Sequence, residues 1–124
     1  QETPLVIIDF HAETTSEKQA FGSYLDGEAS LIYGTHTHVM TADKKIQPNG
    51  TAYITDLGMT GSEDSILGMN KDAVMHRFLT QMGARFEPAK TPPYCINGIC
   101  VTLDTETGKA AKIEAVQKQY SSLQ

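Results

Sequence analysis

The chain has 124 residues, with 10 Lys and Arg against 15 Asp and Glu, so its formal net charge is −5. This length fits one domain with a buried core, and the acidic balance leaves no basic stripe that could neutralise the phosphates of duplex DNA. No apolar run approaches the roughly 18 residues that a membrane span needs. No basic-then-apolar signal opens the chain, so we expect a cytoplasmic protein with no membrane partner.

The first third of the chain shows strand, helix and strand signals in turn. A buried strand is predicted over 4–10, a helix over 16–27 preceded by the capping box Thr14-x-x-Glu17, and a second strand over 29–33. Short connections of this kind are typical of a βαβ unit, so we expect the two strands to be parallel. The apolar face expected of the helix consists of Ala20, Phe21, Tyr24 and Leu25.

The middle of the chain is expected to hold one more strand and one more helix. A polar loop over 41–50 precedes a third strand over 51–55, and the glycine-containing segment 56–69 is expected to be irregular. Asn70 is a favourable N-cap for a helix over 71–82. The apolar face expected of this helix consists of Ala73, Val74, Phe78, Leu79 and Met82.

The last third of the chain reads as antiparallel β structure, so the fold class is α/β, with a βαβ unit followed by a β meander. The meander is expected to consist of strands over 94–96, 99–103 and 112–116, with a turn over 104–109. Asn97-Gly98 favours a two-residue type I′ hairpin, in which Cys95 and Cys100 would face each other. A disulfide and a zinc pair are both geometrically possible there, but two small packing residues are the expected interpretation for a reduced cytoplasmic protein.

Three of the four histidines follow predicted strands. His11 comes directly after the first strand, and His36 and His38 follow the second. In extended backbone, residues two apart point the same way, so His36 and His38 can offer both imidazoles to one volume beside His11. Convergent imidazoles at the carboxyl ends of parallel strands suit Zn, Mn or Fe. The alternative is that these histidines cap loops or line polar margins of the core, and His76 is expected to be a surface residue of its helix.

Few carboxylates are placed to share this site. Asp9 lies on the same strand face as His11 and could ligate a metal or orient the imidazole, and Asp56 ends the third strand and could approach the same edge. Glu13 is expected to favour the positive end of a helix. The glycine pair in the segment 58–61 could cradle an anion or simply form a loop. The sequence contains no nucleophile elbow, P-loop or dinucleotide fingerprint.

The motifs around these residues resemble those of the YmdB-type bacterial metallophosphoesterases, members of the calcineurin-like superfamily that hydrolyse phosphodiesters, including 2′,3′-cyclic nucleotides. The resemblance runs over nearly all of the chain. The motifs that carry it are Asp9–Lys18 (DFHAETTSEK), Gly34–Val39 (GTHTHV), Thr41–Asp43 (TAD), Tyr53–Gly61 (YITDLGMTG), Arg77–Thr80 (RFLT) and Asn97-Gly98.

The resemblance implies a β-sandwich flanked by helices, built around two metal ions that are usually Fe or Mn, with Zn also possible. His11 and His36 match ligands of one ion, and His38 matches a ligand of the other. In the family a metal-bound hydroxide attacks phosphorus while both ions hold the phosphoryl oxygens. The implied activity is therefore that of a phosphodiesterase, and the implied substrate is a cyclic nucleotide or an RNA end.

The resemblance also implies that residues 1–124 are the C-terminal portion of a single metallophosphoesterase domain. The N-terminal half of the family supplies an Asp, a bridging Glu, Asn ligands and the His that protonates the leaving oxygen. None of them has a counterpart in this chain, so no catalytic residue beyond the metal ligands is expected here, and the chain alone is expected to be inactive. That half is the expected partner, and a homo-oligomer is possible.

Two other functions are compatible with the residues. One is a non-catalytic module that binds one metal ion or none and acts by association, because strand edges left uncovered would be templates for pairing. The other is a single-metal hydrolase with Asp9 or Asp56 as its base.

Overall fold

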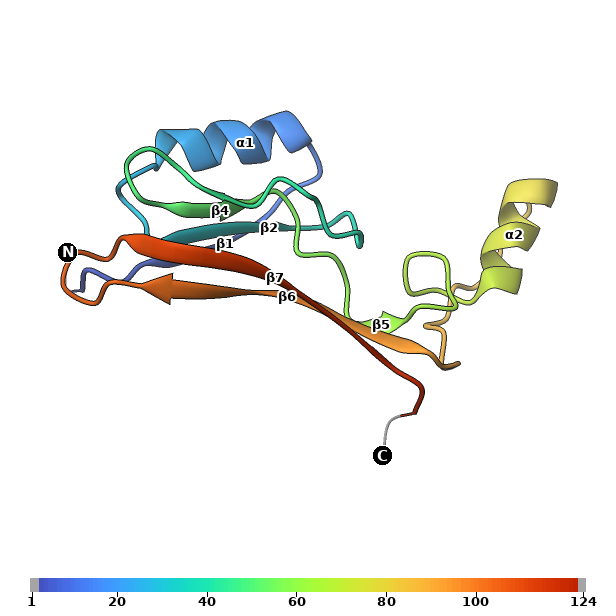
Figure 1. Cartoon of the computed structure of the whole chain (residues 1–124). Helices are drawn as coiled ribbons and strands as arrows, with labels where there is room; N and C mark the ends of the chain where they lie inside the picture. The colour runs from blue at the N-terminus through green and yellow to red at the C-terminus, as the bar shows by residue number, and fades with distance from the viewer. Residues whose placement is uncertain (1–2, 123–124) are drawn as a thin grey trace. The chain divides into compact units, whose positions relative to one another are not determined.

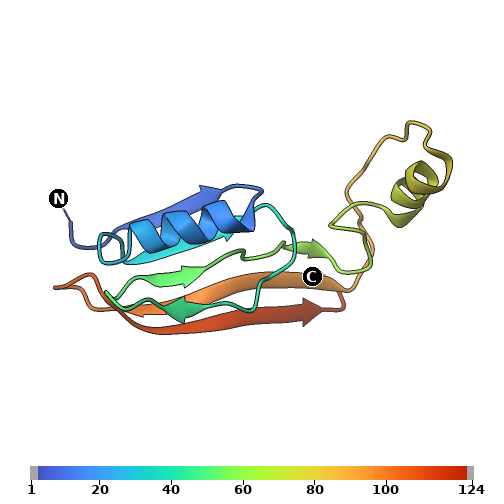
Figure 2. The ribbon, with the colours of Figure 1, turned by 90° about the horizontal axis from the view of Figure 1, so that it is seen from above.

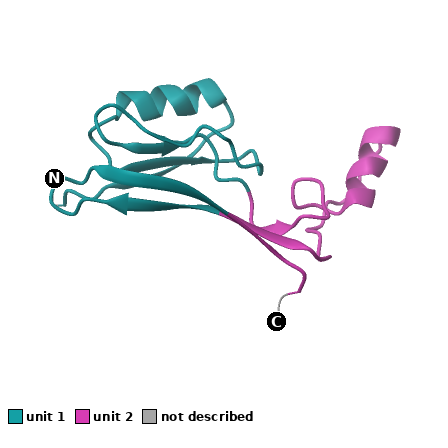
Figure 3. Cartoon of the chain, viewed as in Figure 1, with its two compact units in different colours: residues 1–58, 98–116 teal, residues 59–97, 117–124 magenta. Residues whose placement is uncertain are grey.

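The computed structural model describes residues 3–122, and the chain divides into two compact units (Figure 1, Figure 3). Unit 1, teal in Figure 3, contains the chain up to Gly58 together with Gly98–Val116. Unit 2, magenta, contains Met59–Asn97 and the chain from Gln117 onward. No helix in the described part of the chain is long and apolar enough to cross a membrane.

Unit 1 is built on a four-stranded sheet with the strand order β1-β2-β4-β3. β1 (Ile7–His11) runs parallel to β2 (Leu31–Thr35), and β2 runs parallel to β4 (Ala52–Ile54), whereas β3 (Lys45–Ile46) pairs antiparallel with β4. The helix α1 (Thr15–Tyr24) connects β1 to β2 and lies along one face of the sheet (Figures 1 and 2). The predicted βαβ unit and its parallel strands are confirmed. The first strand, however, is not the buried strand predicted over 4–10: it begins at Ile7, and its residues alternate between exposed and half-buried, with Ile7 61% exposed.

The core of unit 1 lies between α1 and the central strands. Ala29, Ile32 and Tyr53 are buried there. Val6, Ile8, Phe21 and Leu25 pack against them.

The face of α1 that meets the sheet differs from the prediction. Phe21 and Leu25 do face inward, but Tyr24 is 84% exposed, and Lys18 and Gly22 are buried instead. Gly22 is required because a Cβ there would lie only 2.4 Å from the Tyr53 ring, so the helix passes directly over that ring. Lys18 lies on the same stripe, and its ammonium group finds an ion-pair partner beneath the helix.

The N-terminus of α1 only partly follows the predicted capping box. Thr14 is the N-cap residue in extended conformation, as expected, but its side chain makes no capping hydrogen bond. The carbonyl of Thr14 accepts the amide of Lys18 at 3.1 Å, so the first turn closes through the backbone.

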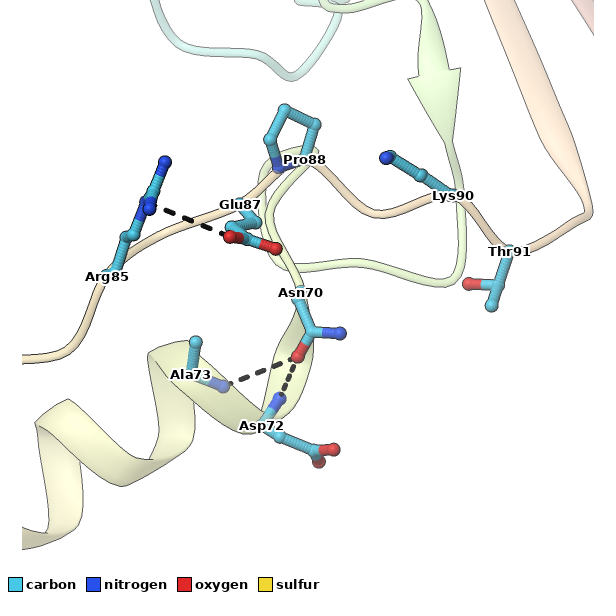
Figure 4. Close-up of a pocket in the computed structure, with 8 residues that line it drawn as sticks. All are labelled: Asn70, Asp72, Ala73, Arg85, Glu87, Pro88, Lys90 and Thr91. Carbon is cyan, nitrogen blue, oxygen red and sulfur yellow. Dashed lines mark hydrogen bonds and ion pairs between the residues drawn. The ribbon is translucent and has the colours of Figure 1, made fainter.

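In unit 2 the helix α2 (Lys71–Thr80) begins where the sequence predicts. The Asn70 side chain accepts hydrogen bonds from the amides of Asp72 and Ala73, which confirms its N-cap role (Figure 4). The predicted apolar face, however, is mostly exposed. Val74 is the one buried residue among those described in α2, whereas Phe78 and Leu79 are each 77% exposed.

The antiparallel part of the fold is a three-stranded sheet with the order β5-β6-β7. β5 (Gly61–Ser62) pairs antiparallel with β6 (Tyr94–Leu103), and a turn after Leu103 leads into β7 (Ala110–Tyr120). The turn is stabilised by the Asp104 carboxylate, which accepts the amides of Glu106 and Thr107. The α/β fold class, with antiparallel β structure after the βαβ unit, is confirmed.

The predicted Asn-Gly hairpin is wrong, because Asn97 and Gly98 lie inside the continuous strand β6. The Asn97 amide is engaged in tertiary contacts: it donates to the Met59 carbonyl at 2.7 Å and its oxygen accepts from Gln117 at 3.2 Å. Cys95 and Cys100 are therefore five residues apart on one strand, about 16 Å at the usual rise of 3.3 Å per residue. Both are free thiols, and they are too far apart to form a disulfide with each other.

Candidate metal centre

The parallel pairing of β1 and β2 brings two of the predicted ligands together. His11 lies opposite Thr35 in the strand register, and His36 follows immediately. His11 Nε2 and His36 Nδ1 are 3.4 Å apart, with the rings nearly perpendicular at 78°. Two nitrogens that each lie about 2.1 Å from one ion would be separated by this distance at a nearly tetrahedral angle of about 108°. The pair therefore fits two positions in the coordination sphere of one ion.

A hydrogen-bonded chain orients the His11 ring. The Thr35 hydroxyl donates to Asp9 Oδ1 at 3.2 Å, and His11 Nδ1 lies 3.0 Å from the same hydroxyl oxygen. Because the hydroxyl proton is directed to the carboxylate, Nδ1 of His11 is the donor in the second contact. This tautomer leaves Nε2 unprotonated on the side of His36, as metal ligation requires. Asp9 thus acts on the imidazole through Thr35, a residue that sequence reasoning missed.

The segment with His36 and His38 is not extended, so the premise that both imidazoles point the same way is not met. Residues 36–39 form a bend after β2, called the histidine bend below, with φ of 140° at His36 and 62° at His38. Both values lie where L-residues are uncommon. Within residues 3–122, no group of three His, Cys, Asp or Glu side chains is arranged to hold a metal ion. The structure therefore brings His11 to His36 and does not gather the three histidines at one point.

Below the bend lies a buried ion pair. Lys18 Nζ is 2.8 Å from Asp56 Oδ2, and the two side chains are 1% and 0% exposed. Asp56 also accepts the amides of Thr37 and Gly58, each at 2.9 Å. Burial acts to raise the pKa of Asp56, but the hydrogen bonds from Lys18 and from these two amides outweigh it and hold the pKa below its ordinary value.

The position of Asp56 explains its role. The sequence predicted that Asp56 could approach the same sheet edge as the histidines. In the structure its carboxylate binds the backbone amide of Thr37, between His36 and His38, and not the histidine rings. Because Gly58 donates its amide to Asp56, that amide is already engaged and does not serve an anion cradle. Lys18 carries no motif of its own. The one signal that could have found it is its place three and four residues before Phe21 and Gly22, on the buried stripe of α1.

A second aspartate, Asp43, supports the other side of the bend. It accepts hydrogen bonds from the Thr41 hydroxyl at 2.7 Å and from the Thr55 amide at 3.1 Å. Burial acts to raise its pKa, but the hydrogen bonds from Thr55 and Thr41 outweigh it and lower the pKa. Asp43 belongs to the polar loop predicted over 41–50, and no local pattern there indicated this role.

The remaining candidates lie outside this cluster. His76 is exposed on α2, as predicted. Glu13 is exposed just before α1, where a carboxylate favours the positive end of the helix.

Comparison with known proteins gives consistent matches. The family model described as "YmdB-like protein" matches residues 1–116. The chain is 52% identical over 116 residues to a Bacillus subtilis (strain 168) protein named 2′,3′-cyclic-nucleotide 2′-phosphodiesterase. That alignment covers 94% of this chain and 44% of the relative, so the chain spans less than half of the relative's length.

Two solved structures have the same fold. A novel phosphatase from Mycoplasma pneumoniae superposes with a TM-score of 0.88 at 44% identity, over 94% of this chain and 41% of that one. A hypothetical protein from Thermus thermophilus superposes with a TM-score of 0.87 at 38% identity, over 94% of this chain and 45% of that one.

Proposed function

Because this chain belongs to the YmdB-like family, we propose that it forms the histidine-bearing part of a metal-dependent phosphodiesterase. The observation that carries the proposal is the His11–His36 pair, with nitrogens 3.4 Å apart and suited to one ion. The name of the Bacillus subtilis relative supports a 2′,3′-cyclic nucleotide as the substrate.

In this proposal the three histidines have distinct roles. His11 Nε2 and His36 Nδ1 hold one ion, and His38 contributes to a second. Iron and manganese are the proposed metals, because imidazole combined with oxygen ligands suits both. Two such ions supply the activation of water and the charge that holds the phosphoryl oxygens.

The residues of this chain prepare that site. Thr35 and Asp9 keep His11 in the tautomer that presents Nε2. All three imidazoles belong to exposed residues, so ligands from another segment can approach them. We propose that this segment is the N-terminal half of the family, which also supplies the acid that protonates the leaving oxygen. The chain alone is then inactive.

The test combines this chain with the N-terminal half of the Bacillus subtilis relative. We expect cleavage of bis-p-nitrophenyl phosphate and of 2′,3′-cyclic AMP with added Mn²⁺ or Fe²⁺, and none from either half alone. His11→Ala, His36→Ala and His38→Ala should each lower the rate by about 100-fold or more, as expected when a metal ligand is lost. His76→Ala is the matched control and should leave the rate unchanged. Equal rates for His38→Ala and His76→Ala would contradict the proposal.

A non-catalytic association module is a second candidate, favoured by the exposed apolar side chains at the end of α2 and just after it. Phe78 and Leu79 are each 77% exposed, and Met82 is 64% exposed. Exposed apolar patches mark interaction surfaces. This candidate predicts that the chain self-associates in light scattering, and that Phe78→Ser with Leu79→Ser restores the monomer. A monomeric parent chain would contradict it.

A further inference from the structure

We propose that the buried Lys18–Asp56 pair is the positioning element of the histidine bend: the Asp56 carboxylate holds the amide of Thr37 and so fixes His36 and His38 on either side of it. The inference rests on the proposed function in one respect, that these two histidines bind metal. The hydrogen bonding itself stands on the geometry alone.

The first step is the strain in the bend. His36 and His38 both have positive φ, and Thr37 lies between them. Non-glycine residues keep such conformations only where contacts with the surrounding structure hold the backbone in place. The amide that lies between the two strained residues donates to Asp56 Oδ2 at 2.9 Å, so this bond restrains both neighbours at once.

The second step is the fixation of Asp56 itself. Its backbone amide donates to the Thr41 hydroxyl at 2.9 Å, and its carbonyl accepts the Thr41 amide at 3.0 Å. The next residue, Leu57, donates its amide to the Gly34 carbonyl at 2.9 Å. Gly34 before the bend and Thr41 after it are therefore both hydrogen-bonded to the backbone of 56–57. Between them, the Thr37 amide is hydrogen-bonded to the Asp56 side chain.

The third step concerns the lysine. Asp56 Oδ2 accepts from both Lys18 and Thr37, so the ammonium group sets the position of the oxygen that holds the bend. A buried carboxylate also needs such a partner, because an unpaired buried charge is strongly unfavourable. Lys18 on α1 thereby binds Asp56, 38 positions further along the sequence, and through Asp56 it is connected to the histidine bend.

The test uses two double variants of the 124-residue chain that differ at one side chain. Lys18→Met with Asp56→Asn and Lys18→Met with Asp56→Leu are both uncharged at the pair, and asparagine and leucine share a side chain of four heavy atoms branched at Cγ. Only the asparagine variant keeps an oxygen that can accept the Thr37 amide. Comparing them separates the positioning of the bend from the general effect of removing a buried ion pair.

The readout is amide hydrogen exchange by NMR, taken as the ratio of the Thr37 rate to the Ala52 rate. The Ala52 amide donates to Ser30 in the sheet at 3.0 Å and reports the stability of unit 1. We expect the ratio to rise several-fold with asparagine, which is a weaker acceptor than a carboxylate, and by roughly tenfold more with leucine. A purely structural pair would change both rates together and leave the ratio constant in both variants, which would overturn the proposal. Should the leucine variant not fold, an unchanged ratio in the asparagine variant would overturn it as well.

A separate measurement tests metal binding by the histidines independently of the role of Asp56. Titration with Mn²⁺ should broaden the ring signals of His11 and His36 in the parent chain, with His76 as the unaffected control. We expect roughly tenfold more Mn²⁺ to be needed in the leucine variant than in the asparagine variant. A parent chain without broadening would contradict the proposed metal site, whereas the exchange ratio would still decide the role of Asp56.

Discussion

Replacing Gly34 by alanine should push the end of β2, which leads into the histidine bend, away from Thr55 just after β4. Gly34 is buried in β2, and a Cβ at this position would lie 1.8 Å from the Thr55 carbonyl oxygen and 3.0 Å from Lys18 Cδ. Ordinary contact begins at 3.4 Å, so the Thr55 backbone would have to retreat by about 1.6 Å, the difference between the two distances. Such a shift breaks the 2.9 Å bond from the Leu57 amide to the Gly34 carbonyl.

The expected cost follows from these two effects. Inserting a group into a well-packed region costs about 1–3 kcal/mol. Leaving a buried backbone group without its partner costs about 1–3 kcal/mol more. We therefore expect Gly34→Ala to lower the free energy of unfolding by about 2–6 kcal/mol, a large share of the about 5–15 kcal/mol typical of a domain.

Urea denaturation followed by far-UV circular dichroism measures this loss. Gly98→Ala is the matched control, because Gly98 belongs to the same unit and a Cβ there would meet nothing within 4 Å. Its unfolding free energy should stay within about 0.5 kcal/mol of the parent value. Equal stability of the two alanine variants would refute the reasoning that Gly34 is required by the close approach of Thr55.

Three further predictions concern the buried charges and the thiols. Lys18→Met alone should lower the free energy of unfolding, measured by urea denaturation, by about 3–5 kcal/mol, because it leaves the buried Asp56 carboxylate unpaired. Adding Asp56→Asn should recover most of that loss, and a double variant as unstable as the single one would contradict this reasoning. The pKa values of Asp43 and Asp56 are lowered in the folded state, so the unfolded chain binds more protons in acid. The melting temperature should therefore fall as the pH drops below about 3.9 towards the folded pKa values, and it should fall less in Asp56→Asn. A melting temperature that stays constant in this range would contradict this prediction. Cys100 is exposed and Cys95 half-buried, so a thiol reagent should label Cys100 first, and mild oxidation should form no bond between the two within one chain.

Much of the fold could be predicted because local patterns decided it. The apolar strand at Ile7–His11 and the strand at Leu31–Thr35 are joined by a helix, and the short connections leave parallel pairing as the natural arrangement. Asn70 caps α2 through its own side chain, an interaction within one helical turn. Such features depend on residues close in sequence, so the sequence carries them directly.

Asn97-Gly98 failed as a hairpin signal because tertiary contacts override turn propensity. The Asn97 amide bonds Met59, 38 residues earlier, and Gln117, 20 residues later. The chain reverses instead at Asp104, whose carboxylate organises the turn locally. A dipeptide preference is small beside a set of long-range bonds, and no local pattern reveals where those bonds form.

The residues of the candidate site also differ in how far the sequence could indicate them. His11 and His36 could be found from their places after parallel strands, since the register brings the ends of such strands together. Thr35, which orients His11, could have been found from the strand pairing, because it lies opposite that residue. Lys18 had only its place on the buried stripe of α1 to mark it, because a lysine on a helix is usually exposed and its partner lies 38 residues further on.

Stability alone does not account for the charged pair beneath the bend. Replacing a buried ion pair by apolar residues of similar volume is often neutral or even stabilising. The pair in this chain does something that apolar residues would not: Asp56 offers an acceptor to the Thr37 amide, between two histidines at positive φ. An oxygen at that depth needs a counterion, and Lys18 is the cation that α1 brings to it. The buried charge is therefore best understood as the consequence of holding the histidine bend in a strained conformation, and the exchange ratio of Thr37 to Ala52 measures that relation directly.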